Sequence, residues 1–551
     1  MLFRKFDLSQ FSDAFDVRAA MIYPWDQVPE TPFKSAWGYL EPRKVLKPHA
    51  HHEGETFVFF SGRGVMTVSG EATEVTPGDI IYMPPLEPHT LENTSDTESL
   101  MFLTLWWEDM ELLAKKERLE AERTASRRPT LVISSPPTPN GYLHLGHLAG
   151  PYLSGDFHAR YLRLRGTDVR FITHSDDNES YVRLRASQHG WTPQEGADHF
   201  ADSIEASFAA AQIQPDFFLR PNHTPNHRRM VERLFLRLWE KGELVPRAMD
   251  VPYCETCDQY RLECYVRGKC PHCGEGADGF VCESCLWPID ATELLERRCT
   301  ECSTPTVDRP LTRLFFQPSR HRDALARWYR GSELPPRVRE LCERMLAEKL
   351  PDVALTQTVG WGTPVPIPGY EGQTIYGAFE IFVAFLVNCQ VMAGKEGLAK
   401  EEDDFGWQRF YGSPDADVVQ FFGADNNYFF AINYPAISLA LDLGLQMPAR
   451  LVPNEFYLLE GKKFSTVRKH LIRLEELKDD VPIDVVRCYL AMTSPETERT
   501  NFERAELDRL WQRELRGNWQ TWLTDLAAKV RALTRMPGGG RGIAPAPSSE
   551  A

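Results

Sequence analysis

This chain of 551 residues shows little of three features: long hydrophobic runs, an apolar leader segment and an excess of positive charge. We find no apolar run that approaches the ~18 residues needed by a membrane-spanning helix. Residues 1–15 lack the hydrophobic core of a signal peptide, so the sequence predicts a cytoplasmic protein without a membrane partner. The formal net charge is −16, from 62 Lys and Arg against 78 Asp and Glu. An extended nucleic-acid footprint is therefore not expected, since such surfaces are usually basic.

Cysteine is present in an arrangement that disfavours disulfides. Twelve cysteines occur, and in the reducing cytosol they are expected to stay unpaired. Eight of them form four Cys-x-x-Cys pairs, a spacing typical of tetrahedral zinc sites. The pairs are Cys254/Cys257, Cys270/Cys273, Cys282/Cys285 and Cys299/Cys302. Four thiolates around one zinc leave no open position for a substrate, so the sequence predicts structural zinc.

Changes of composition along the chain predict a multidomain protein. Short Val-, Phe- and Ile-rich runs separated by Gly-containing turns indicate an all-β barrel at the N-terminus. A charged helical linker follows, and then a strand–helix–strand pattern that predicts an α/β Rossmann-type domain with a parallel sheet. In chain order the expected segments are the barrel 1–112, the linker 113–128, the first Rossmann half 129–249, the cysteine-rich insert 250–308, the second Rossmann half 309–450, a loop and helical region 451–535 and a disordered tail 536–551.

Three histidines and a glutamate in the barrel are spaced as metal ligands. His49 and His51 are two residues apart on a strand and therefore face the same way. Ligand types of this kind leave Fe, Mn, Ni and Zn open. The predicted ligands are His49, His51, Glu55 and His89. The motifs resemble those of the cupin family over the first 110 residues, except that Arg43 and Leu86 stand where that family often has glycine.

A second group of motifs begins where the first Rossmann strand ends. His144 and His147 lie at the start of a helix, which is a natural anion site, and two imidazoles there can stabilise charge on the α-phosphate of ATP. Ser-Asp-Asp, Gly-Ala-Asp and Gly-Lys-Lys-Phe-Ser-Thr follow in that order, at 175–177, 423–425 and 461–466. Together with the cysteine insert, these motifs resemble the methionyl-tRNA synthetases, which are class I enzymes, across about 129–535.

That resemblance implies a role for each matching residue. His144, His147 and Lys463 match the HIGH and KMSKS motifs, so they would be catalytic and would bind ATP together with Mg²⁺. Asp425 would bind the ATP ribose, and Asp176 would hold the α-ammonium group of the amino acid. Two structural zinc knuckles are implied, one formed by Cys270, Cys273, Cys282 and Cys285 and the other by Cys254, Cys257, Cys299 and Cys302.

Departures from that family concern the amino acid and the acceptor. Loss of a Trp and a Tyr removes hydrophobic walls that select a thioether side chain, so methionine is not the expected substrate. The second KMSKS lysine is replaced by Thr466, and 467–551 is too short for the family's anticodon-binding bundle. With the acidic charge, this leads us to expect no tRNA partner. The substrate-pocket positions are Pro136, Thr138, Ala378, Asn426 and Phe430.

A cupin placed before a synthetase-like domain resembles the didomain hydrazine-forming enzymes of natural-product biosynthesis. The resemblance implies an ATP-dependent, N–N bond-forming ligase. It would adenylate an amino acid, pass the acyl group to the hydroxylamine oxygen of N6-hydroxylysine, and rearrange the ester in the cupin. Because the N–O bond is an internal oxidant, we favour Zn²⁺ over a redox metal. Glycine suits the rebuilt pocket best, while Thr138 and Asn426 leave a polar amino acid such as glutamate open.

Three other functions remain open on the sequence. The first is an adenylating amide ligase with an iron-dependent cupin oxygenase. The second is a non-enzymatic sensor of a metabolite and ATP, and the third is a tRNA aminoacylator that recognises only the acceptor stem. The sequence does not indicate the oligomeric state.

Overall fold

The computed structural model divides the chain into two compact units, residues 1–126 and 127–551. The predicted linker 113–128 and tail 536–551 lie, apart from residue 128, outside the described residues. The structure describes residues 5–14, 16–24, 28, 31–107, 128–332, 334–348, 350–398, 406–464, 470–477 and 480–534.

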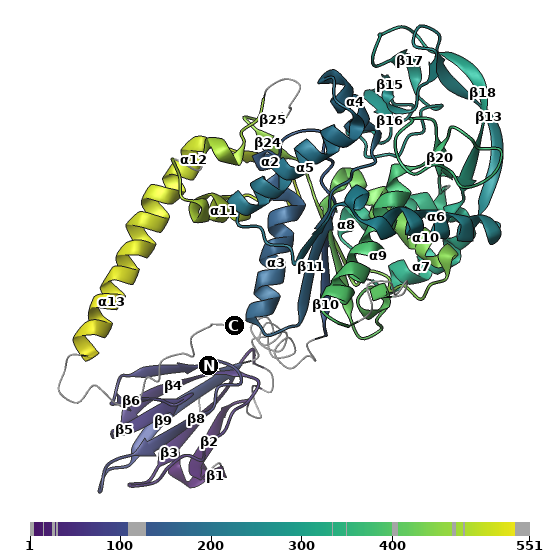
Figure 1. Ribbon diagram of the computed structural model, residues 1–551. Coiled ribbons are helices and arrows are strands. Elements are labelled where there is room, and N and C mark those ends of the chain that lie inside the picture. Colours follow the sequence, from purple (N-terminus) through teal and green to yellow (C-terminus); the bar gives the residue numbers. More distant parts are fainter. Residues whose placement is uncertain are drawn as a thin grey trace. The chain divides into compact units, whose positions relative to one another are not determined.

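The first unit is built from antiparallel β-strands in two sheets (Figure 1). The larger sheet has the order β1-β2-β3-β9-β4-β7 and the smaller one β6-β5-β8. Alternate side chains of β4 point into the barrel, so Phe57 and Phe59 are buried beside Phe102 of β9. The strands are β1 Ser12–Ala14, β2 Val17–Tyr23, β3 Lys34–Leu40, β4 Gly54–Ser61, β5 Gly64–Val68, β6 Glu71–Val75, β7 Ile80–Met83, β8 His89–Asn93 and β9 Leu100–Trp107.

The second unit is organised around a five-stranded parallel sheet with the order β12-β11-β10-β22-β23. Successive residues of β10 enter different cores: Leu131 and Ile133 pack in one and Val132 in the other. Such burial on both faces is typical of a doubly wound α/β domain. The strands are β10 Thr130–Ser134, β11 Val169–His174, β12 Phe217–Leu219, β22 Asp417–Gly423 and β23 Arg450–Asn454.

Helices cover both faces of this sheet, with α3 and α9 on opposite sides of it (Figure 1). The helices that follow the first strands are α2 Leu145–His147, the π-helical turn η2 Leu148–Tyr152, α3 Leu153–Leu164, α4 Ser180–Gln188, α5 Pro193–Ala210 and α6 Pro225–Glu240. Those of the second half are α7 Arg322–Gly331, α8 Pro336–Ala347, α9 Gly377–Lys395, the π-helical turn η7 Phe429–Asn433 and α10 Tyr434–Leu441.

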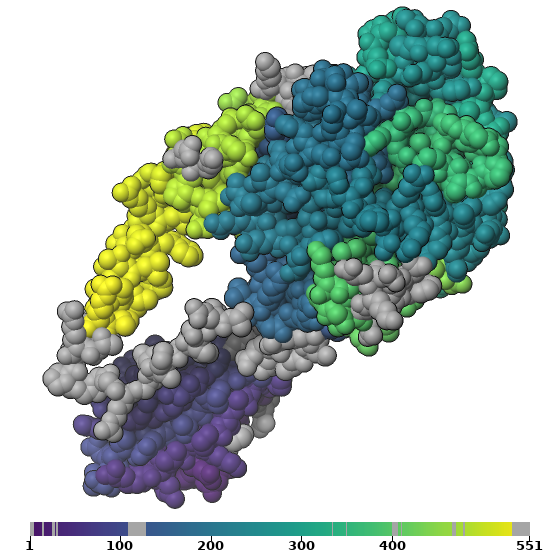
Figure 2. Space-filling view, viewed as in Figure 1, coloured from purple at the N-terminus to yellow at the C-terminus, as the bar shows by residue number. Residues whose placement is uncertain are grey.

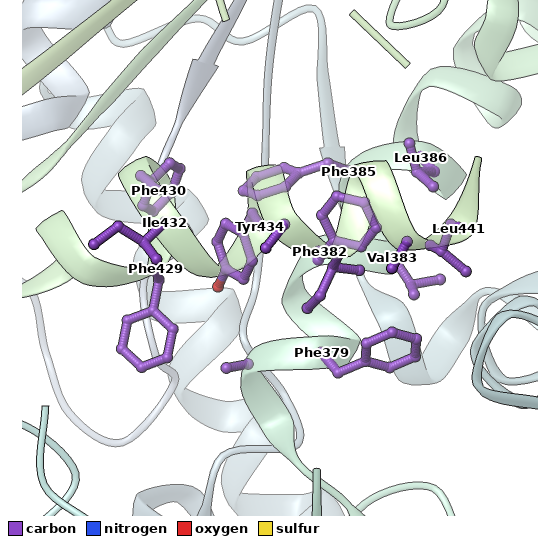
Figure 3. Packing of buried hydrophobic residues seen from close by; sticks show 14 of the residues in the cluster. Phe379, Phe382, Val383, Phe385, Leu386, Phe429, Phe430, Ile432, Tyr434 and Leu441 are labelled. Carbon is purple, nitrogen blue, oxygen red and sulfur yellow. The ribbon is translucent and has the colours of Figure 1, made fainter. Parts of the chain in front are cut away.

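Helix α9 corrects one expectation from the sequence. Its 19 residues are long and apolar enough to cross a membrane, although no such run was anticipated. Within the described residues, 83% of its apolar window is buried inside the protein. Figure 3 shows Phe379, Phe382 and Phe385 of α9 packed with Phe429 and Phe430 of η7. The helix is therefore buried in the core of the second unit.

The cysteine-rich insert forms its own small β-structure between the Rossmann halves. The long hairpin of β13 and β18 carries it, and Figure 2 shows the insert as a teal lobe of the surface at the upper right. A small core that includes Val251, Leu262 and Leu294 supports the lobe. Its strands are β13 Leu244–Cys254, β14 Gln259–Tyr260, β15 Glu263–Lys269, β16 Gly276–Gly279, β17 Leu295–Cys299 and β18 Val307–Phe316.

The C-terminal region begins with a short hairpin and continues as helices. Strand β24 pairs with β25 antiparallel and with β26 in parallel. The elements are β24 Tyr457–Leu459, β25 Lys462–Lys463, α11 Ile483–Met492, β26 Thr500–Phe502, α12 Arg504–Arg509, the π-helical segment η9 Leu510–Trp519 and α13 Gln520–Thr534. The predicted architecture is confirmed: a β-rich first unit, an α/β unit with a parallel sheet and a cysteine-rich insert, and C-terminal helices.

Candidate functional site

The carboxyl ends of three neighbouring parallel strands carry the predicted nucleotide and amino-acid residues. Strand β10 lies between β11 and β22, and the chain leaves it into the loop that holds Pro136 and Thr138. Asp176 follows β11, and Asp425 follows β22. Ligands of open α/β sheets bind in the crevice where neighbouring connections diverge in this way. The strand order therefore brings residues far apart in the sequence to one edge.

The two motif histidines stack on each other at the start of the helical segment after β10. Their ring centroids are 3.6 Å apart with an interplanar angle of 13°. Nδ1 of His144 accepts a hydrogen bond from the backbone N–H of His147 at 3.3 Å, and Nδ1 of His147 accepts one from the N–H of His144 at 3.2 Å. Burial lowers the pKa of His144 to about 2 and that of His147 to about 4. Both imidazoles are therefore neutral at physiological pH.

Close packing above the histidines explains the glycine between them. Phe464, directly after Lys463, stacks on His144 with centroids 4.8 Å apart. A Cβ at Gly146 would lie 3.0 Å from both His144 Nδ1 and the Phe464 ring. Glycine thus lets the loop after β25 approach the helix start. Thr466 of this loop lies outside the described residues.

Lys463 and Asp425 lie at the same edge. Burial raises the pKa of Asp425, and the positive charge of Lys463 lowers it. The same lysine charge lowers the pKa of His147, after the larger effect of burial. Asn426 donates a hydrogen bond to Asp425 Oδ1 at 3.2 Å. This arrangement places a cation, a carboxylate and two neutral imidazoles around one region.

Asp176, the residue predicted to hold the amino acid, is 6% exposed. Thr138 Oγ1 donates to its Oδ2 at 3.1 Å, and the Asp176 backbone N–H donates to the carbonyl of Pro137 at 3.1 Å. The loop containing Pro136 and Thr138 is thereby fastened to the end of β11. Burial raises the pKa of Asp176 well above its usual range, and the charge of Asp177 adds to this.

Aromatic side chains pack closely at the predicted pocket positions. Phe430 stacks on Phe422 with centroids 4.3 Å apart and lies 5.3 Å from Tyr434. Ala378 is buried in the first turn of α9. Beside Asp176 a cavity of about 10 Å³ remains, lined also by Glu380 and Ala384. A larger cavity of about 400 Å³ lies between α3, β23 and α11 and contacts none of the predicted site residues.

Glu380 is a site residue that the sequence reasoning missed. It lines the small cavity and is 3% exposed. Its carboxylate accepts hydrogen bonds from Asn178 Nδ2 at 2.6 Å and from the Thr363 backbone N–H at 2.8 Å. Burial raises the pKa of Glu380 to about 7, although these hydrogen bonds lower it. The available signal was an acidic residue inside an otherwise apolar helix.

In the first unit the four predicted metal ligands converge. Their ligand atoms lie within 4.8 Å of one another. Glu55 Oε2 is 3.0 Å from His51 Nε2 and 3.2 Å from His89 Nε2. The other ring nitrogen of each histidine contacts a backbone carbonyl: His49 Nδ1 that of Lys47 at 2.8 Å, His51 Nδ1 that of Glu53 at 3.0 Å and His89 Nδ1 that of Glu87 at 3.0 Å.

This donor set fits a divalent metal ion. Backbone carbonyls that hold Nδ1 orient Nε2 for coordination, as outer partners of metal ligands commonly do. Burial would raise the pKa of Glu55, but hydrogen bonds from His51, His89 and Thr104 outweigh it and hold the pKa at about 2. Arg43 and Leu86 adopt φ of 62° and 65°, so the residues at these family glycine positions keep the left-handed backbone.

The eight paired cysteines gather into two clusters in the insert. The clusters are Cys254, Cys257, Cys299 and Cys302, and Cys270, Cys273, Cys282 and Cys285. Sulfur–sulfur distances across them are 3.4 Å for Cys254–Cys302, 3.9 Å for Cys257–Cys299, 3.8 Å for Cys270–Cys285 and 3.5 Å for Cys273–Cys282. Four sulfurs bonded to zinc at about 2.3 Å stand about 3.8 Å apart in a tetrahedron. Each cluster can therefore hold one zinc ion.

Comparisons with known families match both parts of the chain. Residues 130–524 match the family described as tRNA synthetases class I (M), and residues 37–106 match the cupin domain family. A solved methionyl-tRNA synthetase of Mycobacterium tuberculosis, bound by methionyl-adenylate, superposes with a TM-score of 0.54 at 20% identity, over 70% of this chain and 69% of that one. This likeness concerns the fold alone.

Curated relatives include the methionine–tRNA ligases of Dehalococcoides mccartyi strain CBDB1 and Pyrococcus furiosus. The first is 35% identical over 375 residues, which are 68% of this chain and 66% of the relative. The second is 32% identical over 389 residues, which are 68% of this chain and 53% of the relative. The matches thus span between about half and just under two thirds of these relatives.

These relatives correct the expectation about partners. We expected no tRNA partner because of the acidic charge and the short C-terminal region. The relatives are named methionine–tRNA ligases, and this finding contradicts that expectation. With the family match covering most of the chain, the chain belongs to the class I (M) tRNA synthetase family and carries a cupin domain before the synthetase domain.

Proposed function

We propose that this chain is an ATP-dependent ligase that activates an amino acid, glycine above all, and joins it to N6-hydroxylysine through an N–N bond. The observation that carries the proposal is one chain with two centres. The predicted nucleotide and amino-acid residues gather at one edge of the parallel sheet, and a three-histidine, one-glutamate cluster lies in the cupin domain. A reaction with an activation step and a rearrangement step accounts for the presence of both centres in one chain.

The activation step follows from the residues at the sheet edge. The carboxylate of the amino acid attacks the α-phosphorus of ATP, the P–O bond to the β-phosphate breaks, and pyrophosphate leaves. Negative charge develops on the phosphoryl oxygens, where neutral His144 and His147 can donate hydrogen bonds and Lys463 supplies positive charge. Mg²⁺ bound with ATP neutralises further phosphate charge.

The pocket favours a small amino acid. In this proposal Asp176 pairs with the α-ammonium group, and Thr138 donates a hydrogen bond to its carboxylate. The cavity of about 10 Å³ beside Asp176 has room for about one water molecule. Phe430 and its stacked partner Phe422 occupy the neighbouring space. Glycine has no side chain that would need space beside these rings.

Transfer of the acyl group and rearrangement of the resulting ester require no added oxidant. The hydroxylamine oxygen of N6-hydroxylysine attacks the acyl carbon, AMP leaves, and the oxygen loses its proton, which gives an O-acyl ester. The amino nitrogen of the glycyl group then attacks the lysine Nε. The N–O bond breaks, the carboxylate departs with the electron pair, and the attacking nitrogen loses a proton. The N–O bond is thus reduced as the N–N bond forms.

The cupin residues suit the second step. His49, His51, Glu55 and His89 would hold a divalent metal, for which we favour zinc; when bound, it supplies Lewis acidity and a template for the flexible ester. Glu55 stays ionised because hydrogen bonds outweigh its burial. Phe57 packs edge-on to His89, with centroids 6.3 Å apart, and supplies an apolar wall beside the cluster.

A second candidate function is aminoacylation of tRNA. The names of the relatives favour it, since they are methionine–tRNA ligases. It shares the activation step with our proposal and differs in the acceptor, a ribose hydroxyl instead of a hydroxylamine.

ATP–pyrophosphate exchange with each of the twenty amino acids tests the activation step. We expect the fastest exchange with glycine and much slower exchange with methionine. Charging of total tRNA, measured in parallel, tests the second candidate. Fastest exchange with methionine together with tRNA charging would replace our proposal by aminoacylation.

A further inference from the structure

An ion pair connects the catalytic lysine to the cysteine-rich insert. Lys463 Nζ lies 2.6 Å from Glu283 Oε1. Glu283 lies between Cys282 and Cys285, two members of one cysteine cluster, whereas Lys463 ends strand β25 of the C-terminal region. The ring of Phe456 supports the ammonium group from 4.5 Å. Segments far apart in the sequence therefore meet through this pair.

The pair lies at the ATP-binding edge. Burial raises the pKa of Asp425, Lys463 lowers it, and the negative charge of Glu283 raises it, so both partners are close to the predicted ribose carboxylate. The charge of Lys463 also acts on His144 and His147, the predicted phosphate residues. Glu283 is thus an anion at the place where the phosphates of ATP need Lys463.

We propose that Glu283 is a positioning residue that holds Lys463 in the nucleotide-free protein and releases it to the phosphates when ATP binds. The inference rests on the proposed function only in taking ATP as the ligand of this edge. It makes the knuckle of Cys270, Cys273, Cys282 and Cys285 a part of the nucleotide site, in addition to its role in supporting the insert.

Exposure makes this exchange of partners feasible. The Lys463 and Glu283 side chains are 46% and 64% exposed. Ion pairs in such surroundings are weak because water screens them. A triphosphate carries several negative charges and accepts several charge-assisted hydrogen bonds, so it can displace a single carboxylate.

The test is the affinity of the full chain for α,β-methylene-ATP with Mg²⁺, measured by calorimetry. Glu283→Gln removes the competing charge and keeps the size, so we expect about two- to fivefold tighter binding, the range that an exposed ion pair represents. In pyrophosphate exchange, the KM for ATP should fall by the same factor while kcat stays unchanged. Unchanged or weaker binding would overturn the proposal.

Matched controls separate this effect from a general change of charge. Glu296→Gln breaks another ion pair of the insert, Lys269–Glu296, which also spans 2.6 Å, and should leave affinity unchanged. In a Lys463→Gln background, Glu283→Gln should bring no gain; an equal gain there would contradict the proposed pairing. Zinc content verifies folding, and Glu283→Asp, which keeps the charge on a shorter side chain, should give a smaller gain.

Failure of this inference can be distinguished from failure of the proposed function. The analogue binds without any amino acid, so its affinity reports on Glu283 whatever substrate is activated. A wild-type chain that binds the analogue but exchanges pyrophosphate with none of the amino acids would contradict the proposed function alone.

Discussion

At the scale of single residues, burial of Asp176 disfavours the ionised form of its carboxyl group. Asp176 is buried at the end of β11, and its raised pKa means that the free protein resists its ionisation. An ammonium group forms an ion pair only with the ionised carboxylate. Its positive charge would lower the pKa that burial has raised. Amino-acid binding should therefore be coupled to release of a proton.

This coupling predicts a pH dependence. Because the pKa of Asp176 is raised, the ionised fraction, and with it kcat/KM for the amino acid in pyrophosphate exchange, should still rise with pH above the range in which an ordinary aspartate ionises. His144 and His147, whose pKa values are about 2 and 4, stay neutral throughout and should add no break. Asp176→Asn should lose the pH-dependent rise together with amino-acid affinity. A flat profile in the wild type would contradict this role.

Individual residues were predictable from the sequence to different degrees. The spacing of His49 and His51 on one strand follows from the two-residue period, so their convergence could be inferred from local geometry. Glu380 could not be recognised in this way, since helical periodicity does not show that Asn178 and Thr363, from distant segments, surround it. The roles of all these residues stay predictions until they are tested.

At the scale of elements, the insert depends on its cysteine clusters. Its strands are short and its core is small, so hydrophobic burial alone gives limited support. Zinc coordination by four thiolates would supply folding free energy directly. The spacing of the cysteine pairs in the sequence was sufficient to predict an insert of this kind.

Removing one thiolate should therefore release one zinc and destabilise the lobe. We expect Cys273→Ser to lose one zinc per chain in elemental analysis and to unfold at a lower temperature than the wild type. Cys488→Ser, on α11 and outside both clusters, is the matched control and should keep its metal. Full zinc content in Cys273→Ser would argue against a four-cysteine site there.

Helix α9 shows where prediction of elements from the sequence was weaker. Its hydrophobic residues surround the whole helix, because it packs against α6, β11 and β12. A helix that is apolar all round gives no amphipathic pattern to mark its buried face. The sequence therefore indicated an α/β region here without revealing its central helix.

At the scale of the whole molecule, the chain consists of two units with separate cores. Phe57, Phe59 and Phe102 lie in the core of the first unit, and the two large cores of the second surround the parallel sheet. A unit with its own core can fold independently. Each of the two proposed steps can thus be assigned to one unit.

Separate expression of the units tests that division. We expect residues 127–551 alone to catalyse ATP–pyrophosphate exchange at a rate within a few-fold of the full chain, and to form no N–N product. Adding residues 1–126 as a separate chain should restore some product. Formation of the N–N product by residues 127–551 alone would show that the cupin is not needed for the rearrangement.

The wrong expectation about tRNA also belongs to this scale. Net charge sums over the entire surface and does not reveal a local basic patch, and segment length does not determine which part of a nucleic acid is contacted. Net charge and segment length describe the chain as a whole, whereas the relatives share residue-by-residue sequence similarity with it. Motif order along the chain proved the better guide to family.

The most direct measurement is one incubation of the full chain with ATP, N6-hydroxylysine and ¹⁵N-glycine, followed by mass spectrometry and ¹⁵N NMR. We predict a product with the mass of both substrates less one water and with the label in an N–N bond. His89→Ala, which removes one cupin ligand, should accumulate the ester of the same mass, distinguished by its intact N–O bond. Absence of any coupled product, despite pyrophosphate exchange with glycine, would contradict the proposed acceptor.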